Sequence, residues 1–84
     1  MFQVYVLYSP SFNKIYIGFT ADLQSRFNSH NELATKGWTV RYRPWIILFF
    51  EIFESKKEAM QREKELKSGK GREFIRKIIL EKYS

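Results

Sequence analysis

The sequence contains no cysteine, a single histidine, two prolines and four glycines among its 84 residues. Without cysteine, the protein has neither a disulfide scaffold nor a thiolate zinc site. No apolar run approaches the roughly 20 residues of a transmembrane helix, and the first residues, Met1 to Val4, lack the basic start of a signal peptide. These absences favour a soluble, cytoplasmic protein that folds by hydrophobic packing alone.

Acidic residues are also scarce, because nine Asp and Glu stand against fifteen Lys and Arg, for a formal net charge of +6. This imbalance favours a polyanionic partner such as nucleic acid, although basic domains without one exist. A chain of this length has room for one domain, 1–84, and buries only about 60% of its unfolded surface, so no deep internal pocket is expected. The 18% aromatic content supplies a compact core.

Two runs rich in β-branched and aromatic residues, Phe2 to Tyr8 and Lys14 to Phe19, predict a β-hairpin. Pairing Tyr8 with Asn13 sets Tyr5 opposite Tyr16, so both tyrosines share one face. We expect that face to stay partly open, because the other carries the aliphatic core residues. Two ordinary strand tyrosines forming a cross-strand pair are the simpler alternative. The same register places Gln3 opposite Gly18 and Leu7 opposite Lys14.

A first helix is predicted to begin at Ala21 with Thr20 as its N-cap, and Leu23 and Phe27 form its apolar stripe. Arg26 and His30 lie four residues apart on one flank of this stripe. We therefore expect a guanidinium and an imidazole side by side at the edge of the core. A boundary histidine with satisfied hydrogen bonds is the alternative.

The segment 31–44 shows no periodicity, and basic and aromatic residues alternate in and just after it. They are Lys36, Trp38, Arg41, Tyr42, Arg43 and Trp45. Such a mixture suits phosphate contact with base stacking. It suits equally a solvated loop whose aromatic rings pack down on the sheet.

An almost unbroken apolar run, Ile46 to Phe53, predicts a central strand covered on both faces, which requires flanking helices. A capping box over Ser55 to Glu58 starts one helix, and the Gly69 to Gly71 segment ends it. A last helix is predicted from Arg72 to about Tyr83. Its buried stripe comprises Phe74, Ile75, Ile78 and Ile79.

Glu63 falls in the middle of the apolar face of the second predicted helix, between Ala59 and Leu66. A buried carboxylate without a partner is strongly destabilising. Glu63 must therefore pair with a basic side chain or bind a cation or a substrate, and the sequence leaves both open.

The order and spacing of a few residues resemble the GIY-YIG nuclease family. They are Tyr5, Tyr16-Ile17-Gly18, Arg26, His30 and Glu63. The resemblance spans essentially the whole chain and is closest to small stand-alone bacterial members, which are similar to the catalytic domain of the excision-repair nuclease. The chain departs from the family pattern in having Gln3-Val4-Tyr5 where Gly-Ile-Tyr would stand, Phe19 where some members have Lys, and no Asn after Asn31.

The resemblance implies an α+β fold, a small three-stranded antiparallel sheet flanked by helices. It also implies an endonuclease that hydrolyses phosphodiester bonds in DNA, in repair or recombination, with one Mg²⁺ or Mn²⁺ on Glu63. Tyr16 is then the candidate base, Arg26 grips the phosphate, Tyr5 orients the water, and His30 holds the phosphate or moves a proton. The candidate substrate-binding residues are Gly18, Lys36, Arg41, Arg43 and Lys67.

The residue chemistry is compatible with these roles. One carboxylate can anchor Mg²⁺, because this ion takes substrate phosphate and waters as its other ligands. A tyrosine has an ordinary pKa of about 10, and a nearby guanidinium and metal favour its phenolate form. Two alternatives stay open: a nucleic-acid-binding module with a weak or inactive nuclease site, and a structural or partner-binding protein. Target choice would come from this domain or from a targeting partner.

Overall fold

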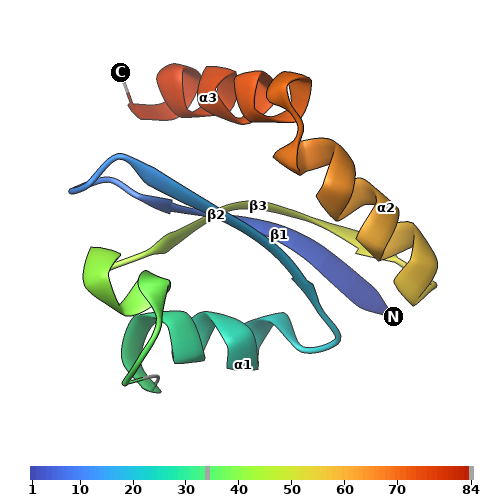
Figure 1. The fold of residues 1–84 in the computed structure, drawn as a ribbon, viewed down its shortest axis with the longest axis horizontal. Coiled ribbons are helices and arrows are strands. Elements are labelled where there is room, and N and C mark those ends of the chain that lie inside the picture. The colour runs from blue at the N-terminus through green and yellow to red at the C-terminus, as the bar shows by residue number, and fades with distance from the viewer. Residues whose placement is uncertain (34, 84) are drawn as a thin grey trace.

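The computed structural model describes residues 1–33 and 35–83, and it shows a three-stranded antiparallel sheet with helices on both faces (Figure 1). The predicted fold class is therefore confirmed. The elements in chain order are β1 (Phe2–Ser9), β2 (Lys14–Thr20), α1 (Leu23–Asn28), the π-helical turn η1 (Ser29–Leu33), the 3-10 helix η2 (Trp38–Tyr42), β3 (Ile46–Phe53), α2 (Lys56–Lys67) and α3 (Gly69–Tyr83). Within the described residues, no helix combines the length and apolar character needed to cross a membrane.

The strand order is β2-β1-β3, so β1 is the central strand. The apolar run was predicted to be the central strand; its bounds are correct, but its place is wrong, because β3 lies at the sheet edge. Leu48 is buried and Phe49 packs on the α2 and α3 side, whereas Phe50 and Ile52 are half exposed. Ile47 packs in the cluster on the opposite face, so both faces of β3 contribute to packing near its start, although β3 has only one neighbouring strand.

The hairpin register differs from the predicted one by two residues, because Tyr5 pairs with Gly18 and Leu7 with Tyr16. The strands extend to the pair Ser9 and Lys14, and Asn13 takes a left-handed φ of 54° in the turn, a conformation that asparagine tolerates. Since side chains alternate with a period of two, this shift keeps both tyrosines on one face.

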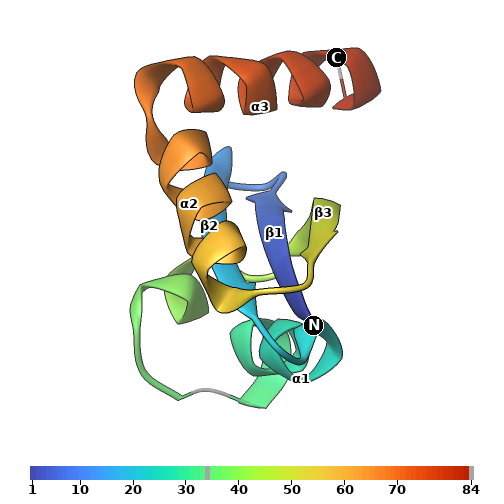
Figure 2. The same cartoon turned by 90° about the vertical axis from the view of Figure 1, so that its right-hand side faces the viewer.

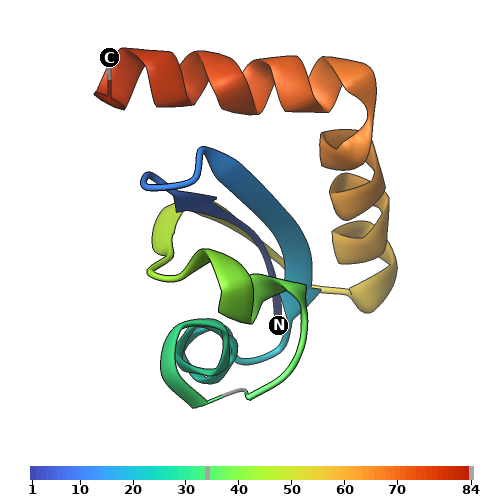
Figure 3. The same ribbon diagram turned by 60° about the vertical axis from the view of Figure 1, so that its left-hand side comes forward.

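Helices cover the two opposite faces of the sheet (Figure 3). Each face carries its own apolar cluster. Val4, Val6 and Ile17 pack against α2 and α3, as predicted. On the opposite face Tyr5, Leu7 and Trp45 form a second buried cluster, which Leu23 and Phe27 of α1 cover. The expectation of a partly open tyrosine face is wrong for Tyr5, which is only 1% exposed. Tyr42, from the segment 31–44 that was predicted to lack periodicity, packs against the same cluster, and part of that segment forms the 3-10 helix η2.

The first helix begins two residues later than predicted. Asp22 is its N-cap, because its carboxylate accepts a hydrogen bond from the Ser25 amide at 3.1 Å. Thr20, the predicted cap, instead accepts from the Asp22 amide at 3.1 Å. A carboxylate at this position also interacts favourably with the positive end of the helix dipole.

The last two helices meet at a tight corner (Figure 2). Ser55 caps α2 as predicted, accepting from the Glu58 amide at 3.1 Å. However, α3 begins at Gly69 instead of Arg72, because the Ser68 hydroxyl accepts from the Gly71 amide and caps the new helix. Gly71 has no space for a side chain, since a Cβ there would overlap the carbonyl oxygen of Glu65.

Replacing Gly71 with alanine is therefore expected to lower the free energy of unfolding by about 1 to 3 kcal/mol, because the added methyl group meets rigid backbone of α2. Urea denaturation followed by circular dichroism measures the change. Gly69→Ala is the matched control, because a Cβ at Gly69 meets nothing within 4 Å. Equal effects of the two substitutions would contradict this reading of the corner.

Candidate active site

Gly18 provides the space in which the phenol of Tyr5 lies. The two residues are paired across β1 and β2, and a Cβ at Gly18 would stand 2.7 Å from the Tyr5 hydroxyl oxygen. Only glycine leaves room for a ring lying across the neighbouring strand. Gly18 therefore sets the position of Tyr5.

The Tyr5 hydroxyl lies at the start of a buried hydrogen-bond chain. It is 3.1 Å from Nε2 of His30, and Nδ1 of His30 is 3.1 Å from the Thr39 hydroxyl. Burial lowers the pKa of His30, and the charges of Arg26 and Arg43 lower it further, so the imidazole is neutral at pH 7. A neutral imidazole carries one N–H, so it donates one of these bonds and accepts the other.

Tyr5 is a poor proton acceptor in this environment. Burial, followed by the proximity of Tyr16, raises its pKa to about 12. It therefore stays protonated at neutral pH and can act as a hydrogen-bond donor or a positioning group. Tyr5 is also the more buried of the two phenols, since Tyr16 is only half buried.

Arg26 joins the two tyrosines. Its side chain is exposed, and hydrogen bonding to Tyr5 is the main cause that raises its pKa, with Tyr16 contributing as well. The rings of Tyr16 and His30 lie 4.6 Å apart, and those of Tyr5 and Tyr16 lie 6.2 Å apart. The structure thus brings together the two phenols, the guanidinium and the imidazole singled out in the sequence.

Glu63 reaches this group from the other side of β2. A pocket of about 320 Å³ lies around the free edge of this strand, and Tyr16 and Glu63 both line it. Its other lining residues are Ile15, Ile17, Trp38, Lys67 and Arg72. Because Ile15 to Ile17 are consecutive, they contribute from both faces, which places the pocket along the strand edge. The charge of Glu63 also acts on Tyr5.

The Glu63 side chain is 21% exposed, and its carboxylate forms an ion pair with Lys67 at 3.5 Å. The sequence left two alternatives open for Glu63, and the structure shows the first, a pair with a basic residue. An i,i+4 pair on a helix is weak, at about 0.5 kcal/mol, so Lys67 does not bind the carboxylate firmly.

The remaining predicted substrate-binding residues lie in different surroundings. Lys36 and Arg41 are exposed. Arg43 donates hydrogen bonds to the carbonyl oxygens of His30 and Ser29, at 2.7 and 3.1 Å, so it stabilises the backbone that carries His30. Its contact with substrate stays a prediction.

Sequence reasoning missed several residues that order the site. Thr39 bonds His30 and also accepts, through its carbonyl, from the Trp45 indole at 2.8 Å. Asn31 accepts from the Trp45 amide at 2.6 Å and donates to the Trp45 carbonyl at 2.8 Å. Arg72 reaches the pocket only through the corner between α2 and α3. These contacts depend on the tertiary fold, and no local sequence pattern predicts them.

Comparison with known protein families identifies one that matches the chain. The family model of the GIY-YIG catalytic domain matches residues 1–77. The chain belongs to the GIY-YIG family. Membership implies a nuclease-type activity and a nucleic-acid substrate. Six residues singled out in the sequence lie within the matched residues: Tyr5, Tyr16, Gly18, Arg26, His30 and Glu63.

Curated bacterial relatives share this similarity. A UPF0213 protein of Staphylococcus haemolyticus is 33% identical over 66 residues, which cover 79% of this chain and 80% of the relative. A UPF0213 protein of Bacillus velezensis is 41% identical over 66 residues, covering 75% and 67%. UPF0213 protein YazA of Bacillus subtilis is 41% identical over 51 residues, covering 61% of this chain and about half of its own length, 52%. These names state no activity. No solved structure matches the chain.

The donor set in the pocket fits a hydrated hard cation. Among the described residues no three His, Asp or Glu side chains cluster as a metal cage. Glu63 is a single, half-buried carboxylate opening into a pocket of about 320 Å³. Mg²⁺ and similar ions are often bound by one or two carboxylates together with waters and substrate phosphate, so one carboxylate beside such a space is a suitable anchor.

The lowered pKa of His30 makes stability depend on pH. Below about 6.5, the ordinary histidine pKa, the unfolded chain binds a proton that the folded protein resists, so the free energy of unfolding falls as pH drops from 7 to 5.5. Urea denaturation across this range measures the slope. In His30→Gln the slope should be smaller, and an unchanged slope would contradict a buried neutral imidazole.

Proposed function

We propose that the protein is a metal-dependent endonuclease that hydrolyses phosphodiester bonds in DNA. The observation that carries this proposal is the pocket at the β2 edge, which Tyr16 and Glu63 line together. A phosphodiester needs an activated water, neutralised phosphoryl oxygens and a stabilised leaving oxygen. Tyr16 is suited to activating the water, and Glu63 is suited to holding a cation that neutralises the phosphoryl oxygens. Both line this pocket.

Tyr16 is the proposed base, because its phenol lines the pocket. Tyr5 has a pKa of about 12 and stays protonated, so its proposed role is to position Tyr16, His30 or the water by hydrogen bonding. Arg26 is exposed beside both phenols, where its planar guanidinium can hold two oxygens of the phosphate. His30 is a positioning residue for Tyr5, bonded at 3.1 Å, and can accept a proton because it is neutral at pH 7.

Glu63 would hold the cation, Mg²⁺ or Mn²⁺. When bound, such an ion supplies positive charge for the phosphoryl oxygens. Lys67 at 3.5 Å and Arg72 on the pocket wall can interact with the same phosphate once the carboxylate has other partners. The basic surface, with Lys36 and Arg41 exposed, would attract the DNA backbone. A cytoplasmic role in repair or recombination, with or without a targeting partner, belongs to the same proposal.

A binding module with a weak or inactive nuclease site is the second candidate. Two observations favour it: Glu63 already has Lys67 as a partner, and the sequence has no asparagine after Asn31. Both candidates predict DNA binding that weakens with salt. Only the nuclease predicts cleavage.

Glu63→Gln is expected to lower the cleavage rate by about 100-fold or more, because the neutral amide is a poor cation ligand, while DNA binding in EDTA survives. Gel assays of a labelled DNA with Mg²⁺ or Mn²⁺ measure the rate. Glu73→Gln is the matched control, since Glu73 is exposed on α3 and outside the pocket lining. No cleavage by the unmodified protein with either ion would favour the second candidate.

Arg26→Lys is expected to keep most of the binding but to lose about 10-fold or more of the cleavage rate, because lysine keeps the charge and lacks the planar fork. Arg26→Ala should lose both. Rates measured at saturating DNA separate the two effects. Full activity of both variants would contradict a phosphate contact at Arg26.

A further inference from the structure

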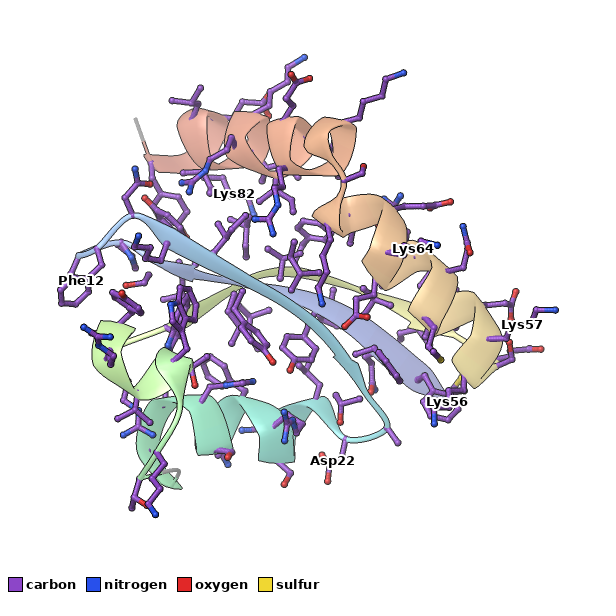
Figure 4. All side chains as sticks on the ribbon, viewed as in Figure 1. Phe12, Asp22, Lys56, Lys57, Lys64 and Lys82 are labelled. Carbon is purple, nitrogen blue, oxygen red and sulfur yellow. The ribbon has the colours of Figure 1, made fainter. Side chains whose placement is uncertain are left out.

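A chain of aromatic rings leads away from the pocket. It consists of Tyr16, Trp38, Tyr42 and Phe12, and we call it the aromatic track. Tyr16 and Trp38 are stacked with ring centroids 6.5 Å apart. Trp38 and Tyr42 follow at 4.7 Å, and Tyr42 and Phe12 at 5.5 Å. Phe12 lies at the tip of the β1–β2 hairpin, at the end of the molecule away from Lys56 and Lys57 (Figure 4).

The two most exposed members of the track are only half covered, although Trp38 also contacts the buried Trp45 at 5.7 Å between ring centroids. Trp38 is 45% exposed and Phe12 is 49% exposed. Trp45, by contrast, is fully buried and its indole N–H bonds the Thr39 carbonyl. Partly exposed aromatic rings in a row are suited to stacking with flat ligands.

Cations flank the same row. The Lys14 ammonium lies 5.5 Å from the centre of the Tyr42 ring, and the Arg41 guanidinium lies 5.9 Å from it. Both side chains are exposed. The track therefore combines ring faces with positive charge, as expected of a surface that binds bases and phosphates together.

Trp38 connects the track to the chemistry, because it lines the same pocket as Tyr16 and Glu63. A strand with its scissile phosphate in this pocket and its path over η2 would pass across Trp38. In a duplex the bases are already stacked on one another and cannot stack on these rings. Unpaired nucleotides can stack on these rings.

We propose that the aromatic track binds unpaired nucleotides next to the scissile phosphate, so that single-stranded nucleic acid is the preferred substrate class. This inference rests on the proposed nuclease function for the position of the scissile bond, and binding tests it independently. Trp38 supplies the main stacking surface, and Lys14 and Arg41 contact the phosphates.

The test uses the full chain carrying Glu63→Gln, in EDTA, so that binding is measured without cleavage. The probe is a fluorescein-labelled oligonucleotide without self-complementarity, alone or annealed to its complement, at the same salt. Anisotropy should show about 10-fold tighter binding of the single strand, and stacking should quench the fluorescence of the exposed Trp38. Equal affinities for both forms would overturn the proposal.

Adding Trp38→Ala should reduce single-strand affinity by about 10-fold and duplex affinity much less, whereas Trp38→Tyr should keep most of the preference. Phe74→Ala is the matched control, because Phe74, which was wrongly predicted to be buried, is 46% exposed on α3. Unchanged affinity of a folded Trp38→Ala protein would overturn the proposal. So would a loss of self-association in sedimentation without any change in binding, which would identify the track as a contact between copies.

Lys14→Gln and Arg41→Gln remove charge without removing a ring, so they test the track even if Trp38→Ala fails to fold. Each should reduce the salt dependence of single-strand binding by about 0.7 in log–log slope, and Lys57→Gln, far from the track, should not. Cleavage of DNA by the unmodified protein without these binding effects would refute the track and leave the nuclease standing. Selective single-strand binding without any cleavage would support the track and refute the nuclease.

Discussion

The absence of a side chain at position 18 is the constraint on which the tyrosine face depends. The phenol of Tyr5 occupies that space, since a Cβ there would stand 2.7 Å from its hydroxyl oxygen. From this position Tyr5 bonds His30, which bonds Thr39. The chain of contacts fixes the segment after α1 against the sheet and leaves Tyr16 half exposed at the edge of β2. Gly18 therefore sets the position of the buried Tyr5 phenol, and through it the surroundings of the half-exposed Tyr16 phenol.

A second constraint sets the position of Glu63. The helix α2 is tied to β3 by Arg62, whose guanidinium donates to both carboxylate oxygens of Glu51, at 2.8 and 3.2 Å. At its C-terminal end, α2 meets α3 so closely that only glycine fits at position 71. With α2 held at its middle and at its C-terminal end, Glu63 lines the pocket at the edge of β2. The pocket lies between Trp38 of η2 and Glu63 of α2, which come from opposite faces of the sheet. A chain of 84 residues can therefore form it without a deep cavity.

Local patterns in the sequence predicted what local physics determines. The β-branched runs gave β3 with correct bounds and β1 and β2 to within one residue, and Ser55 with Glu58 gave the start of α2. The hairpin register, the edge position of β3 and the cap at Asp22 depend on competing turns and tertiary packing, which a local pattern does not encode. The candidate site residues follow from an order and spacing that resemble the GIY-YIG family, and their roles stay predictions. Three features could be seen only in the three-dimensional structure. They are the pairing of Glu63 with Lys67, the backbone contacts of Arg43 and the pocket position of Arg72.

The central claim is that Tyr16 and Glu63 serve one reaction site at the edge of β2. A crystal structure of the protein soaked with Mn²⁺ and a nucleotide 3′,5′-bisphosphate tests it most directly, because anomalous scattering locates the ion. We expect the ion at bonding distance, about 2.1 Å, from a Glu63 carboxylate oxygen, with Lys67 displaced and a phosphate between Tyr16 and Arg26. An ion bound elsewhere, with the Glu63–Lys67 pair intact and no phosphate in the pocket, would contradict the claim.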